Sequence, residues 1–239
     1  KEKEILDVEL ILKDLETIDK KMESFDRLIR TNKPMVKSEE KEYYAIKKAQ
    51  DFLKQQKVLV EQEWTDDEKE ILNQYQLLTL KPRLYLLNGK PGEVSEEVLD
   101  ALKLKPGSGQ ENYVILDIAS EYESEGLNKE ERVGLGFNEL SGTDILIKKS
   151  YELLGLQTFL TTGEDETRAW TIHKGDTAPK AAGVIHSDFE NKFVKAEVIF
   201  WEDLIKSGSY AKARETGLIR TEGKEYVLKD GDIVEFKHG

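Results

Sequence analysis

The chain has 239 residues, 38% of them hydrophobic, which is long for one domain and enough to build several cores. Its net charge is −12, so the molecule as a whole lacks the basic footprint of a nonspecific nucleic-acid binder. The absence of cysteine excludes disulfides and thiolate metal sites and indicates a reducing compartment. No apolar run reaches the length of a membrane span, so we expect a cytoplasmic protein with no membrane partner.

The N-terminal residues carry apolar side chains at alternating spacings of three and four, the pattern of a heptad seam. The seam residues are Val8, Ile11, Leu15, Ile18, Met22, Phe25 and Ile29. We expect one long helix that Lys33-Pro34 breaks, followed by a second helix from about residue 41 to residue 57. Together they predict an antiparallel helical hairpin, or coiled coil, over residues 1–64, with the seam as ordinary core.

Residues 65–154 change from a helical pattern to strands and helices. Thr65 and Glu68 predict a capping box at the start of a helix that runs to about Leu78. The elements expected after it are a strand over 83–88, a helix over 95–104, a turn over 106–109, a strand over 113–118 and a helix over 142–154. Strand, helix, strand predicts a parallel crossover, and because both faces of a parallel pair need cover, we expect part of a larger α/β sheet.

Short strands and turns dominate residues 155–239. We expect strands over 158–162, 167–172, 194–200, 226–228 and 233–236. Asp230-Gly231-Asp232 predicts a turn between the last two strands, and residues 178–185 predict a single short helix with Pro179 in its first turn. One helix against a small mixed sheet is typical of a β-grasp module. The whole chain is therefore predicted to be a multi-domain α+β protein.

No catalytic centre can be read from the sequence. The phosphate-binding run Gly-x-x-x-x-Gly-Lys-Ser/Thr is absent from the 239 residues. The nearest candidates, Gly89-Lys90-Pro91 and Gly223-Lys224-Glu225, lack the hydroxyl that would hold magnesium. The carboxylate pairs Glu130-Glu131 and Glu202-Asp203 have no nucleophile or metal-binding partner beside them. We expect no catalytic residue, no metal ligand and no hydrolysis by this chain alone.

Two motifs near the C-terminus are Arg168-Ala169-Trp170-Thr171-Ile172 and Ala178-Pro179-Lys180-Ala181-Ala182-Gly183-Val184-Ile185-His186-Ser187-Asp188-Phe189. They resemble the TGS domain that ends the YchF/Obg-like ATPases, which belong to the TRAFAC class of P-loop NTPases. Further matches in the same order are Leu77-Leu78-Thr79-Leu80-Lys81-Pro82, Leu156-Gln157-Thr158-Phe159 with Thr162-Gly163, and Asp230-Gly231-Asp232. The resemblance covers nearly the whole chain and implies that the family's P-loop half is absent from it.

The resemblance implies that residues 65–154 are the C-terminal part of a G domain and carry its base-recognition loops. The implied nucleotide contacts are Asn88, Gly89, Ile118 and Ala119. ATP and Mg²⁺ are implied only for a full-length family protein. The family's loop reads Asn-x-Ser-Glu, whereas this chain reads Asn88-Gly89-Lys90-Pro91, so a preference for ATP over GTP rests on the family and not on these residues. A plain turn after a strand explains Asn88-Gly89 equally well.

For residues 155–239 the resemblance implies a TGS domain that binds RNA, the ribosome or a protein partner. The candidate contacts are Arg168, Trp170, His173, Lys174, His186 and Lys192, which combine cations with aromatic surface. The alternative is that Trp170 is core, that His186 caps a helix locally and that the lysines are solvated. Because this segment is close to neutral, any RNA binding must come from one face.

Two functions remain open from the sequence. The first is the C-terminal part of a ribosome-associated Obg-like ATPase, which supplies base recognition and RNA, ribosome or partner binding. In it, ATP would reposition the hairpin and the TGS domain, and unchanged distances between them with and without nucleotide would refute this. The second is a stand-alone TGS adaptor without nucleotide affinity, whose hairpin binds proteins. A purely structural coiled-coil oligomer is disfavoured because the seam is short and Pro34 interrupts it.

Overall fold

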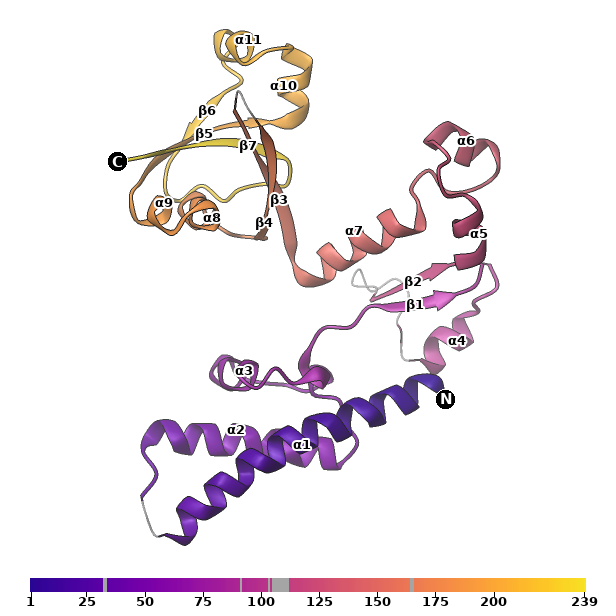
Figure 1. Cartoon of the computed structure of the whole chain (residues 1–239), viewed down its shortest axis with the longest axis vertical. Coiled ribbons are helices and arrows are strands. Elements are labelled where there is room, and N and C mark those ends of the chain that lie inside the picture. The colour runs from indigo at the N-terminus through magenta and orange to yellow at the C-terminus, as the bar shows by residue number, and fades with distance from the viewer. Residues whose placement is uncertain (32–33, 91, 103, 105–111, 164–165) are drawn as a thin grey trace. The chain divides into compact units, whose positions relative to one another are not determined.

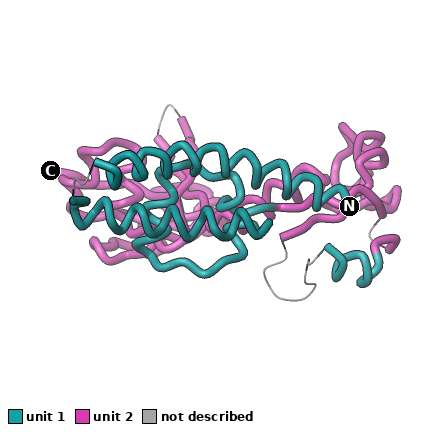
Figure 2. Tube along the Cα trace, turned by 90° about the horizontal axis from the view of Figure 1, so that it is seen from below, with its two compact units in different colours: residues 1–83, 95–106 teal, residues 84–94, 107–239 magenta. Residues whose placement is uncertain are grey.

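The computed structural model has the mixed α+β fold that the sequence predicts. It describes residues 1–31, 34–90, 92–102, 104, 112–163 and 166–239. These fall into two compact units, residues 1–83 with 95–106 and residues 84–94 with 107–239 (Figure 2). The division into three domains that the sequence suggests stays a prediction. Within the described ranges, no helix combines the length and the apolar character that crossing a membrane requires.

The first unit is built on helices α1 (Glu2–Arg30) and α2 (Lys37–Lys54), which lie side by side and run in opposite directions (Figure 1). Helix α1 ends ahead of Pro34, and Lys33 lies outside the described residues. Helix α2 starts earlier than predicted, because the Glu39 carboxylate accepts a hydrogen bond from the Val36 amide (3.0 Å) at its start. It also ends earlier, at Lys54.

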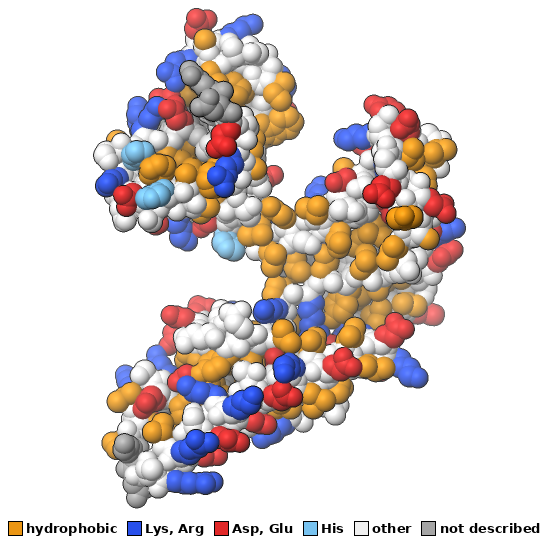
Figure 3. Space-filling model, viewed as in Figure 1, with side chains coloured by type: hydrophobic (Ala, Val, Ile, Leu, Met, Phe, Trp, Pro, Cys, Tyr) orange, Lys and Arg blue, Asp and Glu red, His pale blue; other side chains and the backbone are white. Residues whose placement is uncertain are grey.

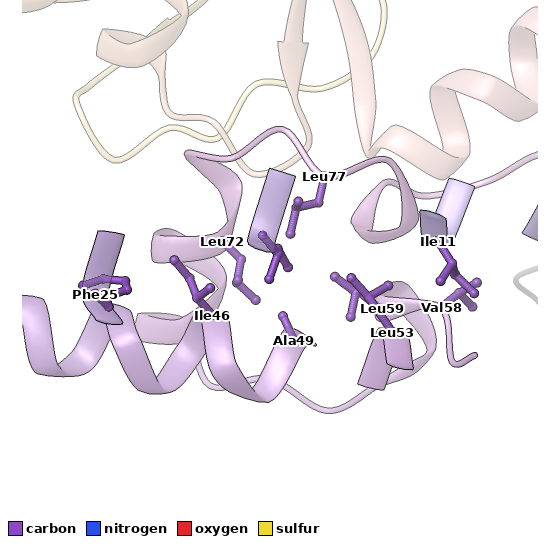
Figure 4. Close-up of a cluster of buried hydrophobic side chains, with 10 residues drawn as sticks. Ile11, Phe25, Ile46, Ala49, Leu53, Val58, Leu59, Leu72 and Leu77 are labelled. Carbon is purple, nitrogen blue, oxygen red and sulfur yellow. The ribbon is translucent and has the colours of Figure 1, made fainter. Parts of the chain in front are cut away.

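The heptad seam is shorter than the sequence predicts. Ile11 and Phe25, which Figure 4 labels, and Ile18 are buried in the core of the first unit. Val8 and Ile29 at the two ends are 41% and 48% exposed. Helix α2 has 18 residues and α1 has 29, so α2 cannot cover α1 along its whole length. Residues from the short helices η1 (Leu59–Glu61) and α3 (Asp66–Asn73) complete this core.

Helix α3 starts at the predicted capping box, in which the Glu68 amide donates to Thr65 Oγ1 (3.3 Å) and the Thr65 amide to Glu68 Oε2 (2.8 Å). It ends at Asn73 and not near residue 78, because residues 78–80 form the separate 3₁₀ turn η2 (Leu78–Leu80). The buried Asp14 carboxylate of α1 accepts hydrogen bonds from the amides of Leu78 (2.8 Å) and Thr79 (2.7 Å). Asp14 therefore fixes η2 against α1.

Strands β1 (Tyr85–Asn88) and β2 (Tyr113–Leu116) pair in parallel, which confirms the predicted crossover. Helix α4 (Glu96–Ala101) lies between them in the chain, and the predicted turn at 106–109 falls outside the described residues. Strand β2 stops at Leu116 and does not reach Ile118 as predicted, because Asp117 caps a new helix.

Three helices follow β2, and only the last was predicted. They are α5 (Ile118–Glu123), α6 (Lys129–Gly134) and α7 (Gly142–Leu154). Helices α6 and α7 each begin at a capping box, built by Asn128 with Glu131 and by Ser141 with Asp144. Helix α7 has the predicted bounds and ends at Gly155, whose positive φ of 63° is a common helix end.

The C-terminal segment forms a five-stranded mixed sheet with the order β4-β3-β7-β5-β6. Its strands are β3 (Leu156–Thr162), β4 (Thr167–His173), β5 (Phe193–Phe200), β6 (Arg220–Glu222) and β7 (Asp232–His238). The strand predicted over 226–228 is wrong, because Val227 forms only an isolated bridge with Thr177. The fifth strand is instead β6, which the sequence analysis missed.

Both faces of this sheet are covered. Phe159 and Ile172 belong to a buried cluster that also contains alanines of helix α8 (Ala178–Ile185). On the other face of the sheet, Ile199 of β5 and Ile233 of β7 form a second cluster with Ala213, and Leu204 packs against it. The helix predicted over residues 178–185 is confirmed with the same bounds as α8, and Pro179 lies in its first turn. The expectation that this is the one helix against the sheet is wrong, because the described residues of this segment form three more, namely α9 (Ser187–Asn191), α10 (Trp201–Ser207) and α11 (Tyr210–Glu215).

Candidate functional site

The candidate base-recognition residues lie where β1 and β2 end. The two strands are parallel, so their carboxyl ends share one edge of the sheet. There the Ile118 amide donates a hydrogen bond to the Asn88 side-chain oxygen (3.2 Å). The Gly89 amide donates to the Leu116 carbonyl (3.0 Å). The structure therefore brings Asn88, Gly89 and Ile118 together, and a side chain links the two loops.

Asn88 keeps one half of its amide available. Its side chain is exposed, and no described residue accepts a hydrogen bond from its NH₂ group. Ile118 and Ala119 are also exposed beside it. When the oxygen of a side-chain amide accepts a hydrogen bond from the protein and its NH₂ group has no partner, the NH₂ group can donate a hydrogen bond to the edge of a base. Pro91, the fourth residue of this loop, lies outside the described residues.

Asp117 shapes the second loop. Its carboxylate accepts hydrogen bonds from the Ser120 hydroxyl (2.7 Å) and the Ser120 amide (3.2 Å), and so caps α5. These hydrogen bonds, led by that of the hydroxyl, hold the pKa of Asp117 below its usual value, and the charge of Lys90 adds to the effect. The second loop therefore presents a fixed anion next to Ile118.

A buried ion pair that the sequence analysis missed holds the helices behind this edge. Arg132 of α6 is buried, and its guanidinium donates to the Glu121 carboxylate (3.0 Å) and to the Ser124 hydroxyl (2.6 Å). Glu121 in turn accepts a hydrogen bond from the Gly142 amide at the start of α7 (2.7 Å). One arginine and one glutamate thus join α5, α6 and α7. No spacing in the sequence signals such a contact.

An open hollow of about 850 Å³ lies among α5, α6 and the start of α7. Ile118, Tyr122, Lys129 and Arg132 are among its lining residues, but Asn88 is not. The hollow therefore meets the base edge at Ile118 but does not include Asn88. Within the parts of the chain that the structure describes, no three acidic, histidine or cysteine side chains gather to form a metal site. The described residues thus offer no acidic cluster that would hold a magnesium ion.

Arg168 and Trp170 of the second candidate surface form one unit on strand β4. The guanidinium of Arg168 lies 4.2 Å from the indole centre, and the indole stacks on Phe159 at 6.5 Å. The Trp170 nitrogen donates to Thr161 Oγ1 (2.9 Å). Trp170 is therefore half-buried at the margin of the core, which agrees in part with the alternative that it is a core residue.

His173 ends strand β4, Lys174 begins the turn that follows it, and both side chains are exposed. The His173 amide donates to Asp176 Oδ2 (2.9 Å), and Asp176 also pairs with Lys180 (3.1 Å). Burial, the largest single influence, raises the pKa of Asp176, but the His173 amide and Lys180 together outweigh it and lower the pKa. Asp176 thus neutralises Lys180 and leaves Lys174 as the uncompensated cation of this turn.

His186 and Lys192 flank helix α9. His186 Nδ1 accepts a hydrogen bond from the Asp188 amide (3.2 Å), so this histidine caps the helix locally. Lys192 pairs with the Asp188 carboxylate at 3.5 Å. The ring of Phe189 stacks on that of His238 at 4.2 Å, a contact that the sequence analysis did not consider. The six candidates thus form three groups, and in the view of Figure 3 basic and acidic side chains are interspersed over this segment.

The comparisons with known proteins agree on one family. The family model YchF-GTPase_C, described as a protein of unknown function (DUF933), matches residues 156–239. The structure of the YchF GTPase from Schizosaccharomyces pombe is similar, with a TM-score of 0.75 and 31% identity. The match covers 98% of this chain and 64% of that one.

Curated relatives give the same result. The ribosome-binding ATPase YchF of Bacillus subtilis is 39% identical over 98% of this chain and 65% of its own length. Obg-like ATPase 1 of Caenorhabditis elegans is 34% identical over 99% of this chain and 61% of its own length. The chain thus spans somewhat less than two thirds of these relatives. On this evidence the chain belongs to the YchF/Obg-like ATPase family, and its last 84 residues match that family's C-terminal model.

Proposed function

We propose that this chain supplies the base-recognition edge and the RNA- or ribosome-binding module of a YchF-type, ribosome-binding ATPase of the cytoplasm. The observation that carries the proposal is the hydrogen bond between the Asn88 side chain and the Ile118 amide. It positions the free NH₂ group of Asn88 at the carboxyl edge of two parallel strands, which is where α/β sheets bind ligands.

The proposed base is adenine. This choice rests on the relatives that are named ATPases. Residue 91 is a proline where the family's Asn-x-Ser-Glu loop has a glutamate, so the loop residues do not themselves select the base. Relatives are named both as ATPases and as a GTPase, so the choice between adenine and guanine has to be tested by experiment.

The parallel sheet supports the proposal that further strands accompany it. Strand β1 pairs only with β2 among the described residues. Leu86 on β1 is 42% exposed and Ile147 on α7 is 54% exposed, and Figure 3 shows hydrophobic side chains gathered over this region. A parallel pair is stable when both of its faces are covered. In the proposed enzyme, the family's P-loop half covers these residues and handles the phosphates, Mg²⁺ and the attacking water.

The C-terminal sheet with α8 is proposed to be the TGS β-grasp domain. Arg168 stacked on Trp170 offers an aromatic ring and a cation together, a combination that suits a base with its phosphate. Lys174, His173, His186 and Lys192 are the further proposed contacts, all of them exposed. The helices α1 and α2 are proposed to form the hairpin that binds protein partners.

Two substitutions at one position test the base edge in the natural protein that carries this chain. Asn88→Asp keeps the oxygen that accepts from Ile118 but loses the NH₂ donor, whereas Asn88→Ala loses both. We expect both variants to bind fluorescent ATP about fivefold more weakly, since one hydrogen bond is worth about 1 kcal/mol. Only Asn88→Ala should loosen the loop, measured as faster exchange of the Ile118 amide.

The outcomes separate the two functions. Unchanged ATP affinity in Asn88→Asp would show that the Asn88 amide does not read a base. Absence of any ATP or GTP binding by the parent protein, together with binding to ribosomes, would favour the stand-alone adaptor. In that case the link between Asn88 and Ile118 would be only a turn.

A further inference from the structure

The outer edge of strand β4 is a long, regular strand edge with nothing paired to it. Strand β4 ends the sheet order, and all seven of its residues pair with β3 without a bulge. The opposite edge is β6, which has only three residues. Proteins protect sheet edges by shortness, bulges, proline or lysine. Strand β6 is protected by its shortness, whereas β4 is long and has no bulge, proline or lysine, and its charged strand residue is Arg168.

The hydrogen-bond pattern shows which backbone groups face outward. The Gly163 amide donates to the Glu166 carbonyl (2.9 Å) and the Lys174 amide to the Gly155 carbonyl (2.7 Å). Bonded and non-bonded pairs alternate in antiparallel ladders, so Arg168, Trp170 and Ile172 bond to β3. The N–H and C=O groups of Thr167, Ala169 and Thr171 therefore point away from the sheet.

Those outward groups have no partner in the parts of the chain that the structure describes. Thr167, Ala169 and Thr171 are all exposed, and no backbone hydrogen bond from another element reaches them. The next outward residue, His173, is different, because its amide donates to Asp176 (2.9 Å) and its carbonyl accepts from the Asp176 amide (3.1 Å). The turn therefore occupies the backbone groups at the His173 end of the edge, and residues 167–171 remain available for pairing with another strand.

We propose that a second copy of this chain pairs with this edge, β4 against β4 in antiparallel direction about a two-fold axis at Trp170. In this register Ala169 lies opposite Thr171 of the second copy, and both residues are of the outward kind, so their amides and carbonyls bond to each other. Thr167 lies opposite His173, whose backbone groups are already engaged, so Ala169 and Thr171 supply the backbone hydrogen bonds that join the two sheets. The proposal rests on backbone groups and is independent of nucleotide or RNA binding.

Charge complementarity favours a second copy over another strand. In the same register Glu166, next to one end of β4, lies opposite Lys174 of the second copy. The two-fold axis produces a second, identical pair. Glu166 and Lys174 occupy positions of the same parity, which place them on one face of the sheet. Both are exposed, and neither forms an ion pair with any residue the structure describes. An RNA strand lacks the alternating donors and acceptors that this edge offers.

The first test uses the absence of cysteine from the full chain. Residues opposite each other in an antiparallel pair have Cα atoms about 5.5 Å apart, a distance that a disulfide spans. We expect a mixture of Ala169→Cys and Thr171→Cys chains to form the mixed disulfide dimer at least about threefold faster than either variant alone forms its own dimer. Equal rates in all three samples, or no dimer, would overturn the proposed register.

The second test measures association of the unmodified full chain by sedimentation, with amide exchange read by NMR. We expect protection of the Ala169 and Thr171 amides to rise with protein concentration. Ala169→Pro removes one outward N–H without touching the bonds to β3, so it should weaken association about tenfold, whereas Ala169→Val should not. Retained protection of the Trp170 amide confirms that the proline variant is folded.

Charge reversal gives the last control. Glu166→Lys and Lys174→Glu should each weaken association about threefold, and the double variant should restore it. A chain that stays monomeric while these amides remain unprotected would overturn the proposal. So would protection of Ala169 and Thr171 in the monomer by an added RNA oligonucleotide or an unrelated strand-forming peptide, because the edge would then serve another partner.

Discussion

Different interactions stabilise the two regions that contain the candidate residues, which are the base edge at β1 and β2 and the five-stranded C-terminal sheet. At the base edge, strands of four residues are held through polar groups, including the Asn88 side chain and the pair of Arg132 with Glu121. In the C-terminal sheet, Phe159 and its neighbours form apolar clusters on two faces. The first arrangement depends on charge state and single hydrogen bonds, and the second depends on packing.

The largest expected effect is in the packed region. Phe159 is fully buried at the centre of the larger cluster, so Phe159→Ala should lower the free energy of unfolding of the C-terminal sheet by about 3–5 kcal/mol. The control is Val194→Ala on strand β5 of the same sheet, because the Val194 side chain is exposed and its loss should cost less than about 0.5 kcal/mol. Urea unfolding measures both. Similar losses for the two variants would contradict a core centred on Phe159.

The next effect tests the polar region. Arg132→Ala leaves the Glu121 carboxylate without its buried partner, which should cost about 3 kcal/mol and raise amide exchange in α5, α6 and the start of α7. Arg214→Ala is the matched control, because the pair of Arg214 with Glu197 is largely exposed at the arginine, and its loss should cost less than about 1 kcal/mol. If both changes cost the same, Arg132 does not hold the base edge together.

A smaller effect separates backbone strain from packing in the C-terminal sheet. Gly231 has a φ of +83°, and a Cβ there would lie 2.6 Å from the Trp201 ring. Gly217 has a φ of +71° with open space around it. Gly217→Ala should therefore cost about 1 kcal/mol from the backbone alone, and Gly231→Ala about 2–3 kcal/mol because the ring must move. Equal melting temperatures of the two variants would show that the ring yields freely.

The smallest expected effect is a pH dependence at the base edge. The pKa of Asp117 is lower in the folded chain than in the unfolded chain, mainly because of the Ser120 hydroxyl, so the charged carboxylate stabilises the fold. This stabilisation is complete above about pH 4 and is lost as the pH falls through the lower, folded pKa. Exchange of the Ser120 amide, corrected for intrinsic rates, should therefore accelerate in acid.

The control for that prediction is Asp117→Asn, which keeps a capping oxygen without a titrating proton. In this variant the Ser120 amide should show no such acceleration. Acceleration of equal size in both chains would assign the effect to another group.

The sequence predicted elements that local chemistry determines. The capping box at Thr65, the bounds of α7 and the parallel pairing of β1 with β2 were all confirmed. The strand predicted over 226–228 was wrong, because an apolar run becomes a strand only where a neighbouring strand is free to pair, and here only Val227 makes a bridge. The helix α10 was missed because its apolar residues continue directly from β5.

In the candidate site, too, features set by the local sequence were predictable and contacts between distant residues were not. The position of Asn88 at a strand end followed from the pattern of apolar residues, but its bond to Ile118 joins positions thirty residues apart and leaves no local signal. The burial of Arg132 was not predictable either, because its neighbours Glu130 and Glu131 have the composition of a solvated helix. The stacking of Arg168 on Trp170 follows from their alternate positions on one strand, whereas the stacking of Phe189 on His238 requires the fold.

The most direct test of base recognition is the NMR signal of the Asn88 side-chain NH₂ group in the natural protein as ATP or GTP is added. We expect ATP to shift this signal and that of the Ile118 amide together, and GTP to shift them less at equal concentration. If both signals stay unchanged while nucleotide binds elsewhere, or if neither nucleotide binds, the edge formed by β1 and β2 does not read the base.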